Sequence, residues 1–430
     1  MADVFALAEV RLWGRTVGAV VEGDDGRIVF QYDPSFQRSG LEISPRTLPL
    51  RTTRPVAFDE LRRKRAFQGL PGVLADALPD AFGYQVIRAY YTARGEQRRA
   101  FSPVQHLLYV GERAMGALTF HPAEAVELGT PEHDALNIAQ LVVDARSIAA
   151  GGTVEVAVPE IYRIGSSAGG MRPKAVVLHN PVSGEVRSAF SPPQPGDVPA
   201  ILKFDGTGED AEEGQIGKPE HYNRVEAAYA LMAREAGIDI VEIDILESTE
   251  GHAHLLIPRF DLSQEGRLHQ HTFGGYAHVD YNDPGASSYE EYLRAILTLG
   301  MPQASVVEGF RRMVFNVLGL NQDDHVKNLS FHMAPSGDWS LTPAYDVTFA
   351  AGSEFTARHQ MRIGHKQEGI QRSDLMAVAD TFSIKGAARI VDQITDVVAE
   401  WPTYARETEV PLFAVEGIGK RLEGRRRELS

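Results

Sequence analysis

Short apolar runs separated by turn residues mark residues 4–32. The runs "FALAEVRLW", "TVGAVVE" and "RIVFQY" alternate with Gly-Arg and Asp-Asp-Gly turns, a pattern typical of a small antiparallel sheet. Apolar residues then recur at helical spacing from Phe67 to Arg94, which predicts helix. After that stretch, "HLLYVG" and "GALTFHP" are predicted to be strands, and residues 123–157 a polar linker and helix.

A second strand-rich region begins near Tyr162, where "IYRI", "AVVL" and "VPAILKFDG" have strand patterns. The stretch "HYNRVEAAYALMAREAGI" has the period of an amphipathic helix that ends at Gly237. "VEIDILES" with "GHAHLLIPRFDL" predicts a hairpin, and from Ser287 onward the chain is mostly helical. The pattern therefore predicts an α+β chain in which a sheet-rich lobe precedes a helical lobe.

Composition narrows the class of protein. A chain of 430 residues with 43% hydrophobic residues can fold into two or three globular domains. It contains no cysteine, which excludes disulfides and thiolate zinc sites. No window approaches the ~18 apolar residues of a membrane span, and the amino terminus lacks the features of a signal peptide, so we expect a cytoplasmic protein without a membrane partner.

The net charge of −15 disfavours general binding to nucleic-acid backbones, which requires clustered Lys and Arg. Only the tail "GKRLEGRRRELS" concentrates cations, and such a run is more often a solvated helix end.

The stretch "LGLNQDDHVKNLSFHM", residues 318–333, places two aspartates, a histidine and two asparagines between apolar segments. Protein kinases use a catalytic-loop Asp to accept the substrate hydroxyl proton, an Asn five positions later to hold Mg²⁺, and a downstream Asp to hold both metal ions. Asp323 and Asn328 have this spacing, whereas Asp324 and Asn328 do not. We assign the base to Asp323, and Asp346 of the following hairpin becomes the principal metal ligand.

Two other interpretations of the same residues remain open. In the first, Asp323 and Asp324 cap a turn, His325 is a half-buried imidazole and Asn328 closes an Asx turn. In the second, Asp323, Asp324 and His325 bind a hydrolytic metal ion, although adjacent residues rarely converge on one ion.

The kinase hypothesis needs upstream parts as well. Lys203 ends an apolar strand, where it can hold the α- and β-phosphates, and Glu226 lies on the following helix as its possible partner. "GSSAGGMRPKA", residues 165–175, supplies small residues whose N–H groups can approach phosphate. It is not a Walker A motif, because Lys174 is four positions beyond Gly170. "IPRFDL" lies between the predicted lobes, where a kinase binds adenine, and Asp261 is placed for ribose.

Taken together, the amino-terminal strands, "FQGLPGVLADALPDAFG", "GSSAGGMRPKA", "LKFDG", "IPRFD", "NQDDHVKNLSFH" and "LTPAYDV" resemble, in order, the HipA family of toxin-antitoxin serine/threonine kinases. The resemblance covers most of the chain. It implies a bilobal kinase-like fold with an N-terminal subdomain over 1–122, a small lobe over 123–260 and a helical C-terminal lobe over 261–430. It also implies Mg-ATP as cofactor and an aminoacyl-tRNA synthetase as the protein substrate.

The resemblance also assigns roles to individual residues. Asp323 matches the catalytic aspartate, Asn328 and Asp346 the metal ligands, and Lys203 the nucleotide lysine. The other implied nucleotide contacts are Gly165, Ser166, Ser167, Ala168, Gly169, Gly170, Lys174, Phe260, Asp261 and His325. The family inhibits itself by phosphorylating a serine of its glycine-rich loop, which here is Ser167 or its neighbour Ser166. A phosphoserine there adds about −1.5 to −2 charge and repels polyphosphate.

The family also implies partners. A HipB-like helix-turn-helix antitoxin would bind this chain, so that contact with operator DNA is indirect. The acidic loop "GTGEDAEEGQIGK" after Lys203 falls where the family carries its activation loop, and a solvated linker is the alternative. Two rival functions stay open: a catalytically silent corepressor that bridges DNA-bound antitoxin dimers, and a kinase of small molecules.

Overall fold

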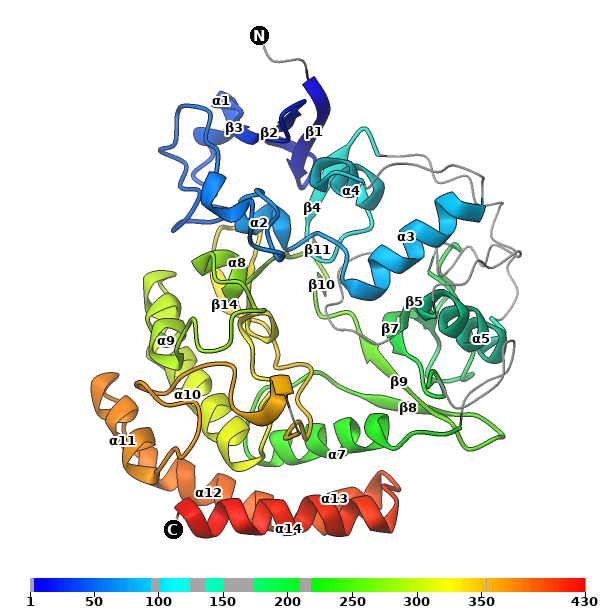
Figure 1. Cartoon of the computed structure of the whole chain (residues 1–430), viewed down its shortest axis with the longest axis vertical. Helices are drawn as coiled ribbons and strands as arrows, with labels where there is room; N and C mark the ends of the chain where they lie inside the picture. Colours follow the sequence, from blue (N-terminus) through cyan, green and yellow to red (C-terminus); the bar gives the residue numbers. More distant parts are fainter. Residues whose placement is uncertain are drawn as a thin grey trace. The chain divides into compact units, whose positions relative to one another are not determined.

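A computed structural model describes residues 4–93, 101–123, 136–150, 173–189, 191–208, 218–352 and 354–429. The chain divides into two compact units, which are described one at a time. Unit 1 comprises residues 1–43, 48–223 and 243–269, and unit 2 comprises residues 44–47, 224–242 and 270–430. Unit 1 holds most of the strands and unit 2 most of the long helices (Figure 1), so the predicted α+β content is confirmed.

The elements of unit 1 are strands and mostly short helices. Its strands are β1 (Val4–Leu12), β2 (Arg15–Gly23), β3 (Ile28–Tyr32), β4 (Leu118–His121), β5 (Lys174–His179), β6 (Val186–Ser188), β7 (Val198–Lys203), β8 (Asp244–Glu247), β9 (Ala253–Pro258), β10 (Leu262–Ser263) and β11 (Gly266–Arg267). Its helices are α1 (Pro34–Gln37), η1 (Asp59–Leu61), α2 (Gly72–Ala75), α3 (Ala81–Ala93), α4 (Pro103–Val110) and α5 (Ile138–Ala149).

The elements of unit 2 are mostly α-helical. Its helices are α7 (Tyr222–Glu235), whose first two residues belong to unit 1, α8 (Phe273–Ala277), α9 (Tyr289–Thr298), α10 (Gln303–Leu318), η2 (Val326–Asn328), η3 (Glu354–Ala357), α11 (Arg372–Thr381), α12 (Ala387–Ala399), α13 (Trp401–Glu407) and α14 (Leu412–Leu429). Its strands are β12 (His269–Thr272), which begins on the last residue of unit 1, β13 (Ser330–Met333) and β14 (Trp339–Leu341).

The predicted amino-terminal sheet is confirmed. Strands β1, β2 and β3 form an antiparallel meander, and β4 adds to β1, which gives the order β3-β2-β1-β4. The β1–β2 turn uses Trp13 and Gly14, both with positive φ, as tight hairpin turns require. At Gly18 of β2 a Cβ atom would lie 2.1 Å from the Gln31 carbonyl oxygen. Only glycine therefore fits at this position.

The prediction of a strand at residues 106–111 is wrong, because this apolar run belongs to helix α4. Ser102 and Gln105 form a capping box: Gln105 N donates to Ser102 Oγ at 3.2 Å, and Ser102 N donates to Gln105 Oε1 at 3.0 Å. Pro103 occupies the first turn, where its missing N–H costs nothing. These start signals outweigh the strand-like run that follows.

The second sheet of unit 1 is five-stranded and antiparallel, with the order β6-β5-β7-β9-β8. The predicted β8–β9 hairpin is confirmed. Helices α3 and α5 pack on the sheet (Figure 1). Their buried side chains form one core with Ala175 and Val177 of β5, Leu202 of β7 and Leu256 of β9. Residues 174 and 203 alternate with the core positions Ala175 and Leu202 along their strands and are register partners of each other.

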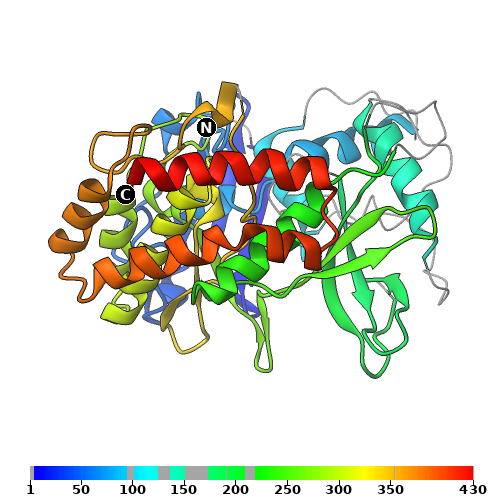
Figure 2. The ribbon, with the colours of Figure 1, turned by 90° about the horizontal axis from the view of Figure 1, so that it is seen from below.

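In unit 2, α10 lies at the centre of the helices and its side chains are buried along most of its length. Helices α9, α12 and α14 each pack against it, and α14 runs beside α12 and α13 (Figure 2). The hairpin β13–β14 follows the loop at the end of α10. None of the helices in the described parts of the chain combines the length and apolarity of a membrane span.

Candidate active site

The predicted catalytic loop leaves α10 at Gly319, and Leu320 follows with a φ of 51°. Residues downstream of Asp346 hold the loop in place. Gln322 N donates to Ala350 O at 2.9 Å, and Ala350 N donates to Leu320 O at 3.1 Å. This parallel pairing brings the segment that follows Asp346 beside the segment that contains Asp323.

Asp323 lies on the open side of the loop, with 42% of its side chain exposed. Asn328 Nδ2 donates to Asp323 O at 3.0 Å and so closes the loop across the predicted five-residue spacing. Desolvation by the surrounding protein atoms, and then the negative charges of Asp346 and Asp324, raise the pKa of Asp323 to about 7. A carboxyl group with such a pKa can exchange a proton near neutral pH.

Asp324 differs sharply from its neighbour, because its carboxylate is buried and accepts three hydrogen bonds. Oδ2 accepts from Tyr289 Oη at 2.8 Å and from His359 Nδ1 at 2.9 Å. Oδ1 accepts from Gln360 N at 2.7 Å. Asp324 thus ties the catalytic loop to the segment around Gln360 and to α9.

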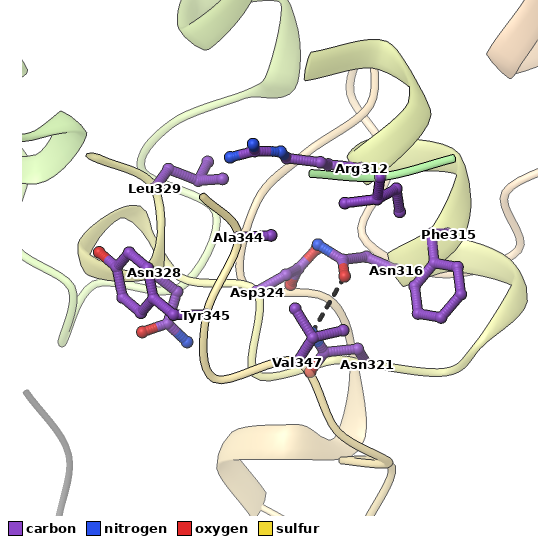
Figure 3. A pocket seen from close by; sticks show the side chains of 11 residues that line it. Arg312, Phe315, Asn316, Asn321, Asp324, Asn328, Leu329, Ala344, Tyr345 and Val347 are labelled. Atoms are coloured by element: carbon purple, nitrogen blue, oxygen red, sulfur yellow. Dashed lines mark hydrogen bonds between the residues drawn. The ribbon is translucent and has the colours of Figure 1, made fainter. Parts of the chain in front are cut away.

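The contacts of Asp324 continue through a buried chain of hydrogen bonds. Asn316 Nδ2 donates to Tyr289 Oη at 2.9 Å. Asn321 Nδ2 donates to Asn316 Oδ1 at 3.0 Å, the dashed bond in Figure 3. Burial, followed by the charge of Asp324, raises the pKa of Tyr289 well above its usual value. The hydroxyl therefore stays protonated and donates a hydrogen bond to Asp324. The pocket that Asn316, Asn321 and Asp324 help to line has a volume of about 20 Å³, room for about one water molecule. It is far too small for a nucleotide.

His325 is the N-cap residue before the short helix η2 and packs near Tyr281, with 5.4 Å between the ring centroids. Burial lowers the pKa of His325 to about 4, so the imidazole is neutral. Its Nδ1 atom is buried and makes no hydrogen bond within the described part of the chain. His325 therefore carries no positive charge near neutral pH.

Asp346 follows β14 and has a φ of 53°, a left-handed conformation that aspartate tolerates better than most residues. The residues just before Asp346 anchor it. Ala344 N donates to Asp239 O at 2.7 Å and Val241 N to Ala344 O at 3.0 Å, while Tyr345 Oη donates to Lys327 O at 2.6 Å. The backbone just before Asp346 is thus fixed by residues 239 and 241 and by Lys327.

The hydrolytic-metal hypothesis for this loop is wrong. Among the described residues, no group of three or more His, Asp or Glu side chains is placed to hold a metal ion. That hypothesis requires Asp324 as a ligand, but both of its carboxylate oxygens accept hydrogen bonds from protein donors. A site built from one Asp and one Asn, as in kinases, needs no such group.

In unit 1, Lys203 is the last residue of β7 and is half-buried. Its register partner on β5 is Lys174. Lys174 is buried, and its Nζ lies 2.7 Å from Asp80 Oδ2. The charge of Lys174 is therefore already compensated, which disfavours direct phosphate binding by this residue. Glu226 is buried on α7 in unit 2.

Asp261, predicted to contact ribose, is fully buried. Arg259 donates to both of its carboxylate oxygens, at 2.9 and 2.6 Å, and Gly116 N donates to Oδ2 at 2.8 Å. Burial alone would raise the pKa of Asp261, but these bonds and the charges of Arg259 and Arg267 lower it. This carboxylate is committed to structural contacts, which argues against a ribose role. Phe260 beside it is half-buried.

The predicted glycine-rich loop lies outside the described residues. This holds for Gly165, Ser166, Ser167, Ala168, Gly169 and Gly170, and for most of the acidic segment after Lys203. Their roles remain predictions from the sequence.

The carboxyl-terminal cations are largely structural, contrary to a free basic patch. Arg425 is buried and donates to the carbonyl oxygens of Val317 at 3.2 Å and Ile370 at 2.9 Å. Arg421 donates to the carbonyl oxygen of Ala351 and lies over the ring of Phe349, 5.3 Å from its centroid. Arg427 pairs with Glu423 on the same helix.

Several structural partners were not identified from the sequence. Tyr289 and His359 hydrogen-bond to Asp324 but each lies 35 residues from it in the sequence, and no local pattern links them to it. Asn316 is near the loop in the sequence, but its bond to Tyr289 again depends on the tertiary fold. Asp80 did carry a signal: a Leu-Pro-Asp segment directly before a helix is typical of an N-cap.

The fold and site define a kinase-like α+β protein, and comparison with known proteins gives its family. Residues 8–121 match the HipA N-terminal domain and residues 166–401 match the HipA-like C-terminal domain. The chain belongs to the HipA family of toxin-antitoxin kinase-like proteins, as its motifs predicted.

Individual relatives agree with this family. The chain is 25% identical over 354 residues to the Sinorhizobium fredii protein named "Putative kinase Y4dM", which covers 79% of this chain and 76% of the relative. The Shewanella oneidensis HipA–HipB–operator DNA complex contains a chain that superposes with a TM-score of 0.67 at 18% identity, over 98% of this chain and 97% of its own length. The Helicobacter pylori kinase CtkA gives a TM-score of 0.36 at 11% identity, covering 60% of this chain and 90% of CtkA, too low for any argument.

Proposed function

We propose that the chain is an ATP- and Mg²⁺-dependent serine/threonine protein kinase, the toxin of a two-component module, with Asp323 as its base. The observation that carries the proposal is the contrast between adjacent aspartates. Asp324 is buried and uses both oxygens to anchor the loop, whereas Asp323 is open and has a pKa of about 7. A loop that fixes one carboxylate and presents the next suits proton transfer from a hydroxyl.

The residues around Asp323 fit a magnesium ion. Asn328 points its amide nitrogen at the Asp323 carbonyl, which leaves its amide oxygen as a hard ligand, and Asp346 adds a carboxylate. The pKa of Asp323 is raised partly by Asp346 and Asp324, so the site carries an excess of negative charge that a cation offsets. Asn328 and Asp346 would hold the ion, and the bound ion would offset charge on the triphosphate.

Lys203 would hold the α- and β-phosphates from the end of β7. Asp323 would orient the acceptor hydroxyl and take its proton. Neutral His325 would offer a hydrogen bond to the nucleotide, Phe260 would contact the adenine, and the 165–170 loop would cover the phosphates. We omit Lys174 and Asp261 as nucleotide ligands, because their charged groups are already paired within unit 1.

We also propose the finer features that family membership suggests. These are self-phosphorylation at Ser166 or Ser167, an aminoacyl-tRNA synthetase as substrate, and a HipB-like antitoxin partner. The match to a chain of a HipA–HipB–operator DNA complex supports the partner. The net charge of −15 and the inward-turned Arg421 and Arg425 favour DNA contact only through the antitoxin. The proposed domains are 1–122, 123–260 and 261–430.

The test incubates the purified full-length chain with Mg-ATP and locates phosphate by intact and peptide mass spectrometry. Asp323→Asn removes the proposed base. Asp338→Asn, in the exposed β13–β14 turn, makes the same charge change away from the site and is the matched control. Phosphate on Ser166 or Ser167 in wild type and Asp338→Asn, but not in Asp323→Asn, supports the kinase. Equal phosphorylation in all three refutes the role of Asp323.

If wild type carries no phosphate, MgATP binding is titrated and candidate synthetases are offered as substrates. Absence of both nucleotide binding and transfer would favour the silent corepressor.

A further inference from the structure

We propose that Asp80 is a positioning residue for the nucleotide-binding end of β7, because it neutralises Lys174, the cross-strand neighbour of Lys203. The inference rests on the proposed function in one respect, the role of Lys203 in holding the phosphates. It adds that a residue of the amino-terminal part of the chain determines whether Lys203 can take that role.

The strand register supplies the first step. In the antiparallel β5–β7 pair, Lys174 is directly opposite Lys203, so the two side chains leave the same face of the sheet. Directly opposed residues lie close enough to interact, and like charges at such positions are destabilising. A second cation beside Lys203 therefore needs a counter-charge if Lys203 is to remain in place.

Asp80 supplies that counter-charge. Its Oδ2 lies 2.7 Å from Lys174 Nζ, and the side chains of Lys174 and Asp80 are only 6% and 9% exposed. Removal of one partner from a buried ion pair is strongly destabilising, because the remaining charge has lost a close counter-charge. Lys174 must then move, or its charge acts on Lys203.

Asp80 is itself held firmly, so the counter-charge has a fixed position. Gly83 N donates to Asp80 Oδ1 at 2.7 Å, and Tyr84 N donates to Asp80 O at 2.9 Å. Asp80 thus caps the start of α3 with one oxygen and pairs with Lys174 through the other. Helix α3 is in turn anchored to the sheet through Phe82, Val86 and Tyr90 of the shared core.

Through these contacts, the first turn of helix α3 holds Lys174, the first residue of β5, in place. Lys174 is also the tenth residue of the segment "GSSAGGMRPKA", which is predicted to approach phosphate. The cap, the ion pair and the strand register therefore link the amino-terminal part of the chain to the predicted phosphate site within unit 1.

The test separates phosphate recognition from folding. Affinities for MgATP and for adenosine are measured by calorimetry on the full-length wild type, Asp80→Asn, Lys203→Met and the double variant Asp80→Asn/Lys174→Met. Asparagine keeps an oxygen for the α3 cap and removes only the charge. Adenosine has no phosphates, so its affinity reports a general loss of structure.

We expect Asp80→Asn to weaken MgATP binding about tenfold, equivalent to about 1.4 kcal/mol, with adenosine affinity unchanged. Asp80→Asn/Lys174→Met removes both buried charges and should bind MgATP within about twofold of wild type. This double variant also keeps the proposal testable if Asp80→Asn fails to fold, since neutral replacements of a buried ion pair are commonly tolerated.

The outcomes distinguish this inference from the proposed function. If Lys203→Met leaves MgATP affinity unchanged, the role of Lys203 fails and this inference fails with it. If Lys203→Met weakens binding but Asp80→Asn does not, the inference alone is overturned. It is also overturned if Asp80→Asn weakens adenosine and MgATP equally, or if the double variant binds MgATP as poorly as Lys203→Met.

Discussion

Tyr289→Phe isolates the hydrogen-bonded chain that anchors the catalytic loop. The substitution keeps a fully buried ring and removes one hydroxyl group. That hydroxyl accepts from Asn316 Nδ2 and donates to Asp324 Oδ2. Its removal leaves a buried amide N–H without an acceptor and takes one of two donors from Oδ2 of a buried carboxylate, since His359 remains.

The cost follows from these two lost bonds. A hydrogen bond to a charged group is worth about 1.5–3 kcal/mol, and a neutral bond about 0.5–1.5 kcal/mol. We expect Tyr289→Phe to lower the free energy of unfolding by about 2–4 kcal/mol. We also expect slower phosphoryl transfer, because a shift of Asp324 would displace the adjacent Asp323. The KM for ATP should change little, because the proposed nucleotide lysine, Lys203, belongs to unit 1.

Tyr292→Phe is the matched control. Tyr292 lies one helical turn further along α9 and is also fully buried. Burial raises the pKa of Tyr292 to about 12, although the nearby charge of Arg312 opposes this rise. The Tyr292 hydroxyl makes no well-formed hydrogen bond to any described residue. Its removal should change stability by less than about 1 kcal/mol. The assay is urea unfolding followed by circular dichroism, together with steady-state kinetics. Equal losses in the two variants would refute the reasoning.

Three further predictions concern the same unit. Without Mg²⁺, Asp323 should make the free energy of unfolding fall as pH rises from about 4 to about 7. Its raised pKa means that the folded state binds the proton more tightly than the unfolded state. Asp323→Asn should remove that fall in pH-dependent thermal melts, and an unchanged profile would contradict the prediction. Asp324→Ala should lower the free energy of unfolding by about 3–5 kcal/mol, whereas Asp323→Ala should abolish transfer and melt within a few degrees of wild type; similar melting of both would reject the assigned division of roles. Arg425→Met should lower the free energy of unfolding by about 2–3 kcal/mol, because two hydrogen bonds to backbone carbonyls are lost. The exposed Arg427→Met should lower it by less than about 0.5 kcal/mol. Both values come from denaturant titration, and equal losses would favour a solvated carboxyl-terminal helix end.

Local patterns predicted most elements correctly because the hydrophobic period records which face of an element is buried. The strands of the first sheet, the β8–β9 hairpin and helix α7 all follow that rule. The wrong strand at residues 106–111 shows its limit. A short apolar run fits either a strand or a buried helix, and here the capping box of Ser102 and Gln105 decides.

The site was only partly predictable. The spacing of Asp323 and Asn328 is local, so the sequence could single out Asp323 over Asp324. The reason that Asp324 is buried lies in Tyr289 and His359, which are brought to it by tertiary folding alone. The same holds for Lys174, which the glycine-rich motif suggested as a phosphate ligand and which Asp80 neutralises across a long stretch of chain.

The position of α14 near the end of the sequence has a consequence for the order in which contacts can form during synthesis. Arg421 and Arg425 of this helix hold the carbonyl oxygens of Ala351, Val317 and Ile370, which flank the catalytic loop and the segment after Asp346. A ribosome makes all of those segments before it makes α14. A nascent chain that has exposed residues 318–333 therefore still lacks the two arginines that brace their surroundings until translation has passed residue 425.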